Sequence, residues 1–420
     1  MTVEVSRLDN GFTVATDAMV GVRSATVGVW VDAGARDESV EHNGISHLLE
    51  HMAFKGTERR SAADISREIE AVGGHLNAYT SREHTAYHAR VLAPDLPLAV
   101  DLLADILRHS TFDPVELGRE VKVVAQEIAQ VDDTPDDLIF DLFQETAYPN
   151  QPMGRSILGT ADGIARIDSA MLRAHLERAY RADRMMLVAA GAIEHGAVVA
   201  LAQAAFGSMP RSGDGRARAA PAYLGGERRE PRELEQLHVV LGFAGPAYRD
   251  AIYYPLQVLS TLLGGGMSSR LFQEVREKRG LAYAIHSFAS SYVDGGLFGI
   301  YAGCDAASAA EVLDLVCAEA CATARAVAAD DVERAKAQLR AGLLMALESS
   351  SARAEQLARH LLVFGKPIAV DEIIARVDAV TPANVVDAAR AVLRADRLTM
   401  TAIGPVEGLA ARDALARRLP

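Results

Sequence analysis

The order of apolar and polar positions changes character along the chain, and each pattern predicts an element. Near the start, two alternating runs flank Asp9, Asn10 and Gly11, a turn sequence that favours positive φ, so they predict a β-hairpin. Residues 22–33 and 76–92 have the composition of strands. Helical periodicity predicts a helix that begins near Gly44 and further helices over 62–72, 96–109 and 115–132.

After a change in composition, the second half of the chain repeats the order of elements predicted for the first. Residues 212–233 are rich in Gly, Pro and Arg and lack apolar periodicity, so they predict an interdomain linker. Beyond it, the order strand, helix, strand, strand, helix recurs at an offset of about 205–210 residues. We therefore expect an α+β fold of two duplicated αβ half-modules, each a mostly antiparallel sheet packed with helices. The expected domains are 1–211 and 234–420, joined by the linker 212–233.

Composition and charge narrow the function classes. Half of the 420 residues are hydrophobic and 24% are charged, which is typical of a folded protein and excludes disorder as its main state. A net charge of −13 disfavours a nucleic-acid binder and favours a basic partner or substrate. The apolar runs are short, so no membrane span is expected. Three cysteines and no basic leader predict a cytoplasmic protein, with a bacterial cytoplasm favoured.

The most informative string runs from His47 to His51, with Glu50 inside it. On a helix, the two histidines are four residues apart and share one face, so both imidazoles can approach one metal ion. Glu50 lies on nearly the same face, where a carboxylate can act on water at the metal. This H-x-x-E-H order reverses the H-E-x-x-H order of many zinc peptidases. The alternative is a surface helix with two solvated histidines, on which Leu48 and Leu49 would pack in the same way.

Two histidines are too few for a catalytic zinc ion, which commonly has three protein ligands. The helix expected over 115–132 offers Glu120 and Glu127, which are seven residues apart and therefore lie on one side. One of them can ligate the metal while the other supports a ligand through a hydrogen bond. The spacing alone does not distinguish Glu127 from Glu116 or Glu120.

Three features together resemble the pitrilysin-like inverted zincins, and within them the mitochondrial processing peptidases and their bacterial relatives. They are the H-x-x-E-H string, its continuation over 52–57, and Glu127 placed 76 residues after His51. The resemblance covers nearly the whole chain. It implies that His47, His51 and Glu127 bind one zinc ion per chain. It further implies that Glu50 is the general base and that Glu120 supports the site.

The same resemblance implies contributions from elsewhere in the chain. In the family, an Arg and a Tyr seven residues later reach the active site from the C-terminal half, and Arg276 and Tyr283 have this spacing. A guanidinium and a phenol are suitable donors to a developing oxyanion. An extended substrate adds to the family's edge strand by backbone hydrogen bonds. The matching residues here are Asn77, Ala78, Tyr79 and Thr80.

Two carboxylates are candidates for recognising a basic substrate. Asp137 and Asp141 are one helical turn apart and fall where the processing peptidases hold a substrate arginine. A pair of carboxylates suits a guanidinium. The alternative is an acidic, solvated helix face.

These expectations combine into a zinc metalloendopeptidase that cleaves extended, basic peptides or segments similar to targeting sequences. The helix expected over 254–263 carries no His or Glu, so the second half is expected to lack metal ligands. For a chain of this length the resemblance implies a dimer, a homodimer first and a heterodimer with a zinc-less homologue second. The rival class is a non-catalytic core or partner subunit of such an assembly. The sequence does not separate specific processing from general peptide clearance.

Overall fold

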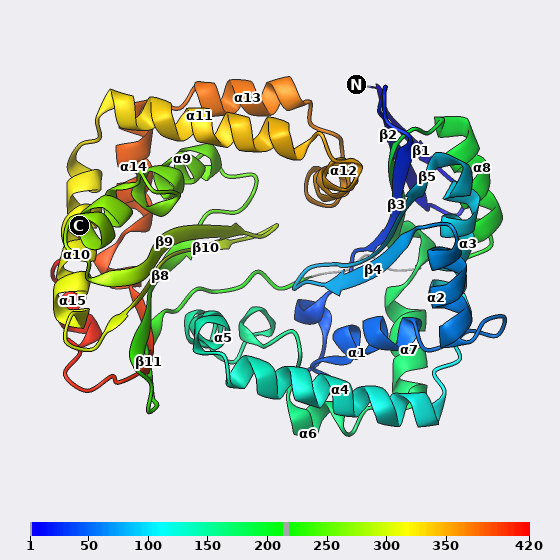
Figure 1. The fold of residues 1–420 in the computed structure, drawn as a ribbon, viewed down its shortest axis with the longest axis horizontal. Coiled ribbons are helices and arrows are strands. Elements are labelled where there is room, and N and C mark those ends of the chain that lie inside the picture. The colour runs from blue at the N-terminus through cyan, green and yellow to red at the C-terminus, as the bar shows by residue number, and fades with distance from the viewer. Residues whose placement is uncertain (1, 213–217) are drawn as a thin grey trace. The chain divides into compact units, whose positions relative to one another are not determined.

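The computed structural model describes residues 2–212 and 218–420 and divides into two compact units. The first unit consists of Met1–Ala129, Arg155–Arg218 and Met345–Ile368. The second consists of Gln130–Gly154, Ala219–Leu344 and Ala369–Pro420. Each unit is built on one sheet with helices on both faces (Figure 1).

The first unit contains a six-stranded sheet. Across the sheet the strands are β1 (Thr2–Arg7), β2 (Thr13–Ala18), β6 (Met185–Gly191), β3 (Ser24–Val31), β5 (Thr85–Leu92) and β4 (His75–Thr80). Strands β2 and β6 are parallel, and the other neighbours are antiparallel. The main core lies between one face and α1 (Ile45–Ala53), α2 (Ala62–Ala71), α3 (Leu96–Arg108), α4 (Pro114–Asp132), α6 (Ala161–Ile164), α7 (Ser169–Ala179) and α8 (His195–Phe206). Helix α12 (Ser350–Phe364) covers the other face.

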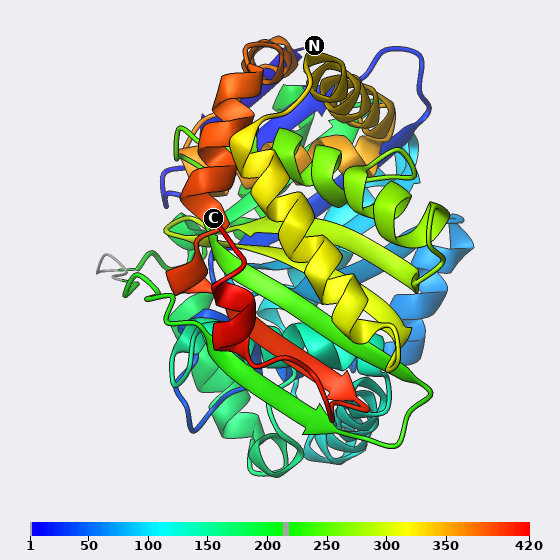
Figure 2. The ribbon, with the colours of Figure 1, turned by 90° about the vertical axis from the view of Figure 1, so that its left-hand side faces the viewer.

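The second unit contains a five-stranded sheet. Across the sheet the strands are β7 (Gly226–Pro231), β11 (Thr399–Gly404), β8 (Gln236–Gly245), β10 (Gly296–Asp305) and β9 (Ala282–Ser291). The core of one face is formed with α9 (Tyr253–Gly264), α10 (Ala309–Arg325), α11 (Ala329–Ala346), α14 (Pro382–Val392) and α15 (Arg412–Ala416), several of which are in front in Figure 2. Helix α5 (Pro135–Ala147) covers the other face. The unit also contains α13 (Val370–Asp378) and the π-helix Phe272–Glu277.

The two sheets confirm the expected duplication. Counted along the chain from β2 and from β7, the strands of both sheets lie in the order first, fifth, second, fourth, third. In both sheets the first and fifth strands are parallel and the remaining pairs are antiparallel. The fold is therefore a pair of similar, mostly antiparallel αβ halves.

The compact units differ at two helices from the contiguous domains 1–211 and 234–420 expected from the sequence. Helix α5 precedes residue 211 but buries Ile139 and Phe143 in the core of the second unit. Helix α12 follows residue 234 but packs Ala354 and Leu357 against the first sheet. Each helix follows a long helix of its own half and covers the sheet of the other half. Composition along the chain does not reveal such an exchange, because both helices are ordinary amphipathic segments.

Within the predicted interdomain linker 212–233, residues Gly226–Pro231 form β7, which pairs in parallel with β11. Four of its six residues are charged, so the strand shows no apolar alternation, and backbone hydrogen bonds hold it at the edge of the sheet. Residues 213–217 of the expected linker lie outside the described residues. None of the helices in the described part has the length and apolarity needed to cross a membrane.

Candidate metal centre

Helix α1 carries the H-x-x-E-H residues on the side opposite its buried face. Leu48 and Leu49 are fully buried, whereas His47, Glu50 and His51 are half-buried. The apolar residues fix the helix against the core of the first unit. Packing of this apolar face therefore fixes the position of the helix that carries His47, Glu50 and His51.

The first turn of α1 is capped by a residue outside the helix. The helix follows Gly44, whose φ of 95° favours glycine and whose missing Cβ would lie 2.7 Å from the carbonyl oxygen of Leu158. Because glycine has no side chain to cap the helix, the carboxylate of Glu38 accepts hydrogen bonds from the backbone N–H groups of Gly44 and Ser46, both at 2.8 Å. Glu38 is 4% exposed. It fixes the turn that carries His47.

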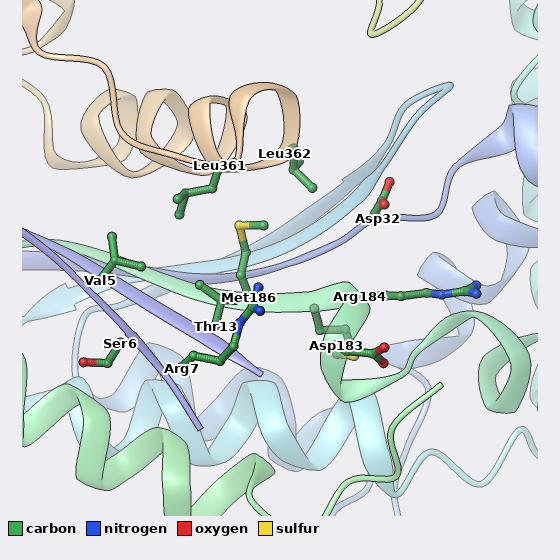
Figure 3. A pocket seen from close by; sticks show the side chains of 12 residues that line it. Val5, Ser6, Arg7, Thr13, Asp32, Asp183, Arg184, Met186, Leu361 and Leu362 are labelled. Atoms are coloured by element: carbon green, nitrogen blue, oxygen red, sulfur yellow. The ribbon is translucent and has the colours of Figure 1, made fainter. Parts of the chain in front are cut away.

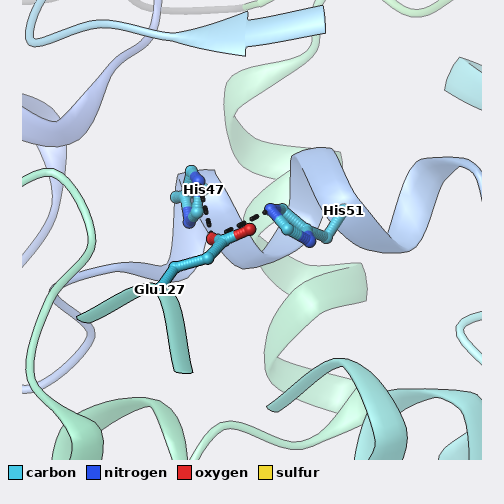
Figure 4. Close-up of side chains that lie close together, drawn as sticks. All are labelled: His47, His51 and Glu127. Atoms are coloured by element: carbon cyan, nitrogen blue, oxygen red, sulfur yellow. Dashed lines mark ion pairs between the residues drawn. The ribbon is translucent and has the colours of Figure 1, made fainter. Parts of the chain in front are cut away.

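The side chains of His47, His51 and Glu127 converge from α1 and α4 (Figure 4). Glu127 Oε2 lies 3.8 Å from His47 Nε2 and 3.5 Å from His51 Nε2. Ligands about 2.0–2.2 Å from a tetrahedral zinc ion are roughly 3.4 Å apart, so this donor set fits zinc with small adjustments. Within residues 2–212 and 218–420, this is the one group of three or more His, Cys, Asp or Glu side chains whose ligand atoms all lie within 4.8 Å of one another.

Helix α4 also places Glu120 against the same histidine. Glu120 Oε2 accepts a hydrogen bond from His51 Nδ1 at 3.1 Å, and its Oε1 lies 2.6 Å from Lys55 Nζ. A proton on Nδ1 leaves Nε2 of His51 free to face Glu127, the usual arrangement around a metal-binding histidine. Lys55 compensates the charge of Glu120, which is 4% exposed.

The electrostatics of His47 favour metal binding. Burial, with a smaller contribution from His51, lowers the pKa of His47 to about 4. The imidazole is therefore neutral near pH 7, which is the form that ligates metal. Its Nδ1 atom is buried without a hydrogen-bond partner among the described residues, and its Nε2 atom faces Glu127.

Glu50 is positioned by the neighbouring strand. The hydroxyl of Thr80, at the end of β4, donates a 2.6 Å hydrogen bond to Glu50 Oε2. Burial raises the pKa of Glu50, and the hydrogen bond from Thr80 and the charge of His51 partly oppose this shift. A carboxylate whose pKa is raised toward neutrality is suited to accept and release a proton.

Strand β4 lies at the edge of the first sheet, as the resemblance to the family implies. It pairs antiparallel with β5 along its whole length and has no second neighbour in the described sheet. Its backbone therefore offers hydrogen-bonding groups that another strand can use. The four candidate residues are Asn77, Ala78, Tyr79 and Thr80.

The remaining candidates belong to the second unit. The guanidinium carbon of Arg276 lies 5.3 Å from the ring centroid of Tyr283, a side chain that is 75% exposed. Asp137 and Asp141 lie one turn apart on α5, with Asp137 exposed and Asp141 half-buried. Each pair is therefore brought together within the second unit.

Sequence reasoning missed three side chains of the metal centre. Glu38 lies in the preceding loop, seven residues before Ile45, the first residue of α1, and so shares no helical spacing with the histidines. Lys55 follows His51 by one turn, and this spacing could have suggested a shared partner. Thr80 was predicted for its backbone, and its hydroxyl contact with Glu50 joins segments 30 residues apart.

A cavity of about 360 Å³ lies elsewhere in the first unit (Figure 3). Met186 of β6 and Leu361 and Leu362 of α12 form its apolar wall, and Arg7 and Arg184 lie at its border. It is on the face of the sheet that α12 covers, and its lining includes none of the candidate metal ligands.

Comparison with known proteins decides the family. The sequence model of the insulinase peptidases, peptidase family M16, matches residues 13–161, and that of the inactive domain of the same family matches residues 166–339. This chain belongs to peptidase family M16. It is therefore a metallopeptidase by family, and the ligand group lies within the part that matches the insulinase model.

Relatives in this family are similar along most of their length. An uncharacterized zinc protease of Streptomyces coelicolor is 40% identical, with 97% of this chain and 90% of that protein covered. The β subunit of the mitochondrial processing peptidase of Blastocladiella emersonii is 37% identical, with 97% and 89% covered. A protease from Helicobacter pylori has the same fold, with a TM-score of 0.90, 24% identity, and 96% of this chain and 99% of that chain covered.

Proposed function

We propose that this chain is a zinc-dependent endopeptidase that binds one zinc ion and cleaves extended, basic peptides, including segments similar to targeting sequences. The observation that carries the proposal is the convergence of His47, His51 and Glu127, with Glu50 on the adjoining position of the same helix. The zinc proteases among its relatives support the choice of metal.

The chemistry follows from the roles of the side chains. A bound zinc ion supplies Lewis acidity, which polarises a carbonyl group and makes water more acidic. Glu50 accepts a proton as the water oxygen bonds to the scissile carbonyl carbon, and it returns the proton to the amine when the C–N bond breaks. Glu120 and Thr80 hold His51 and Glu50 in orientation. Arg276 and Tyr283 are proposed as donors to the oxyanion, and their mutual contact supports a joint role.

The arrangement and charge of the candidate binding residues support the proposed substrate class. The edge strand β4 favours an extended backbone, because an added strand must satisfy its free N–H and C=O groups. Asp137 and Asp141 on α5 provide carboxylates for a substrate arginine. The net charge of −13 adds long-range attraction for basic peptides.

The proposed setting is the cytoplasm of a bacterium, where the chain works as a homodimer or, second, with a zinc-less homologue. Bacterial zinc proteases among the relatives support the source. A relative described as a subunit of a processing peptidase supports an assembly.

The proposal is tested with a matched pair of variants on α4. Glu127→Gln removes the candidate ligand, whereas Glu116→Gln removes a carboxylate paired with Arg119 on the same helix. A basic peptide of about twenty residues, long enough to pair along a strand, serves as the quenched substrate. We expect Glu116→Gln to match the wild type and Glu127→Gln to lose zinc and turnover together. A zinc-loaded wild type without turnover would instead indicate a non-catalytic subunit.

A further inference from the structure

Side chains of β4 make different contacts on the two faces of the first sheet. Consecutive residues of a strand point to opposite faces, and their Cα atoms are about 3.8 Å apart. Thr80 donates its hydroxyl proton to Glu50 on the α1 side. Tyr79 reaches α12 on the other side, where its ring packs with the cluster of that helix. A shift of the strand therefore moves both contacts together.

Glu355 of α12 binds two aromatic side chains of the first sheet. The phenol of Tyr79 donates a 2.7 Å hydrogen bond to Glu355 Oε1. The indole Nε1 of Trp30 donates to Glu355 Oε2 at 3.3 Å. The phenol is also 3.0 Å from His84 Nε2. Burial, with the charge of Glu355, raises the pKa of Tyr79. The phenol therefore stays protonated and can donate the hydrogen bond to Glu355.

Helix α12 is itself anchored to the sheet away from β4. Ser350 Oγ lies 2.8 Å from Thr26 Oγ1 on β3, and Arg353 donates to Asp17 on β2 at 3.2 Å. These contacts fix the start of the helix on the central strands. Glu355, one turn later, is then a stationary acceptor for an edge strand that has one backbone neighbour.

We propose that Glu355 is a positioning residue for the proposed hydrolysis, because it holds β4 through Tyr79 and thereby sets the contact between Thr80 and Glu50. The inference rests on the proposed function. Helix α12, from the C-terminal part of the chain, then helps to position the general base Glu50 of α1. A loss of alignment at a reacting group lowers the rate without removing the metal.

Three variants and one control separate positioning from stability. Tyr79→Phe removes the hydroxyl, and Glu355→Leu removes both acceptor oxygens. Glu355→Gln keeps one acceptor for the phenol and is the conservative rescue. Ser350→Ala is the matched control, because it weakens the docking of α12 at a contact that does not involve β4.

The expected result is a fall in kcat of about tenfold in Tyr79→Phe and in Glu355→Leu, with unchanged zinc content. Glu355→Gln should recover most of the loss, and Ser350→Ala should keep the wild-type kcat. The double variant Tyr79→Phe/Glu355→Leu should be no slower than the slower single variant, because both changes remove the same hydrogen bond between Tyr79 and Glu355. Wild-type kcat in Tyr79→Phe, the mildest change, would overturn the proposal.

Hydrogen exchange measured by mass spectrometry gives a readout that is independent of activity. The amides of β4 should exchange faster in Tyr79→Phe and Glu355→Leu than in the wild type and in Ser350→Ala. Unchanged exchange in β4 would overturn the proposal even if the rate falls. If the zinc-loaded wild type cleaves no peptide, the proposed function fails, and the exchange data alone then decide whether Glu355 holds the strand.

Discussion

Helices α1 and α9 follow the equivalent strands β3 and β8 in sheets of the same strand order, but their side chains differ in kind. Helix α1 combines a buried apolar face with His47, Glu50 and His51. Helix α9 has a longer buried set, which includes Leu256 and Leu259, and no His or Glu. The duplicated scaffold supplies a helix in each unit, and the chemistry depends on the side chains that one of them carries.

The helices that cover the other faces differ in the same way. In the second unit, Phe140 of α5 packs edge-on against Phe288 of β9, with ring centroids 5.2 Å apart. In the first unit, Glu355 of α12 accepts a hydrogen bond from Tyr79 of β4. Ring contacts tolerate small shifts, whereas a hydrogen bond to a carboxylate depends on distance and angle. The unit with the candidate metal centre has the more directional contact at its edge strand.

Removing a candidate metal ligand should leave the first unit, like the second, without metal chemistry. We expect His51→Ala to lose the metal and to lower kcat/KM by at least about a thousandfold, because both the Lewis acid and its ligand are gone. Metal analysis of the purified variant, together with peptide cleavage, checks the expectation. A full zinc complement in His51→Ala would contradict the ligand assignment. Chelation of the wild type and return of zinc provide the control.

Core truncation can be compared between the units, because the helix after β3 and the helix after β8 each carry a fully buried leucine. Leu48 of α1 and Leu259 of α9 are both fully buried. We expect Leu48→Ala and Leu259→Ala each to lower the free energy of unfolding by about 2–5 kcal/mol. Zinc titration should show weaker binding in Leu48→Ala alone, since that leucine supports the ligand helix. Equal weakening in both variants would mean that the two helices do not act separately.

A pH effect on stability is expected in the first unit from a buried histidine that is not a candidate metal ligand and whose Nε2 lies 3.3 Å from Ser46 Oγ on α1. His175 of α7 is 3% exposed, and burial, with smaller contributions from Arg178 and His42, lowers its pKa to about 4. The unfolded chain binds this proton at about 6.5, so stability is present above that pH and is lost as the pH falls toward 4.

The expected loss in the free energy of unfolding due to His175 is about 3 kcal/mol at pH values near and below 4. Urea unfolding of metal-free wild type and His175→Gln between pH 7.5 and 4.5 measures it. The variant should show the shallower pH dependence. If stability depends on pH equally in the two proteins, His175 does not cause the pH effect.

The smallest expected effect concerns substrate charge. Asp137→Asn and Asp141→Asn should each raise KM for an arginine-containing peptide by about threefold to tenfold, with little change for a neutral peptide. Asp133→Asn, an exposed neighbour before α5, is the matched control. An equal effect of all three changes would favour the alternative of a general acidic face.

Local patterns in the sequence predicted much of the fold. The helices expected over 62–72 and 96–109 correspond to Ala62–Ala71 and Leu96–Arg108, because amphipathic spacing is a property of a single segment. The convergence of His47 and His51 was predictable for the same reason. The region 76–92, which has the composition of strands, forms two strands in the structure, β4 and β5. Composition did not indicate the turn that joins them.

Contacts between distant segments were not predictable from one sequence. Spacing could not choose between Glu116, Glu120 and Glu127, because all three lie on one helix and their distances from α1 depend on packing. The cap supplied by Glu38 and the anchoring of Tyr79 by Glu355 are single-residue contacts without a repeating pattern. Such contacts require the three-dimensional arrangement.

The proposed general base is Glu50, beside a zinc ion bound by His47, His51 and Glu127. The most direct measurement compares the wild type with Glu50→Gln for zinc content and for turnover of a quenched basic peptide. We expect equal zinc in both proteins and a loss of kcat of about a hundredfold to ten-thousandfold in Glu50→Gln. Turnover at the wild-type rate in zinc-loaded Glu50→Gln would contradict this role of Glu50.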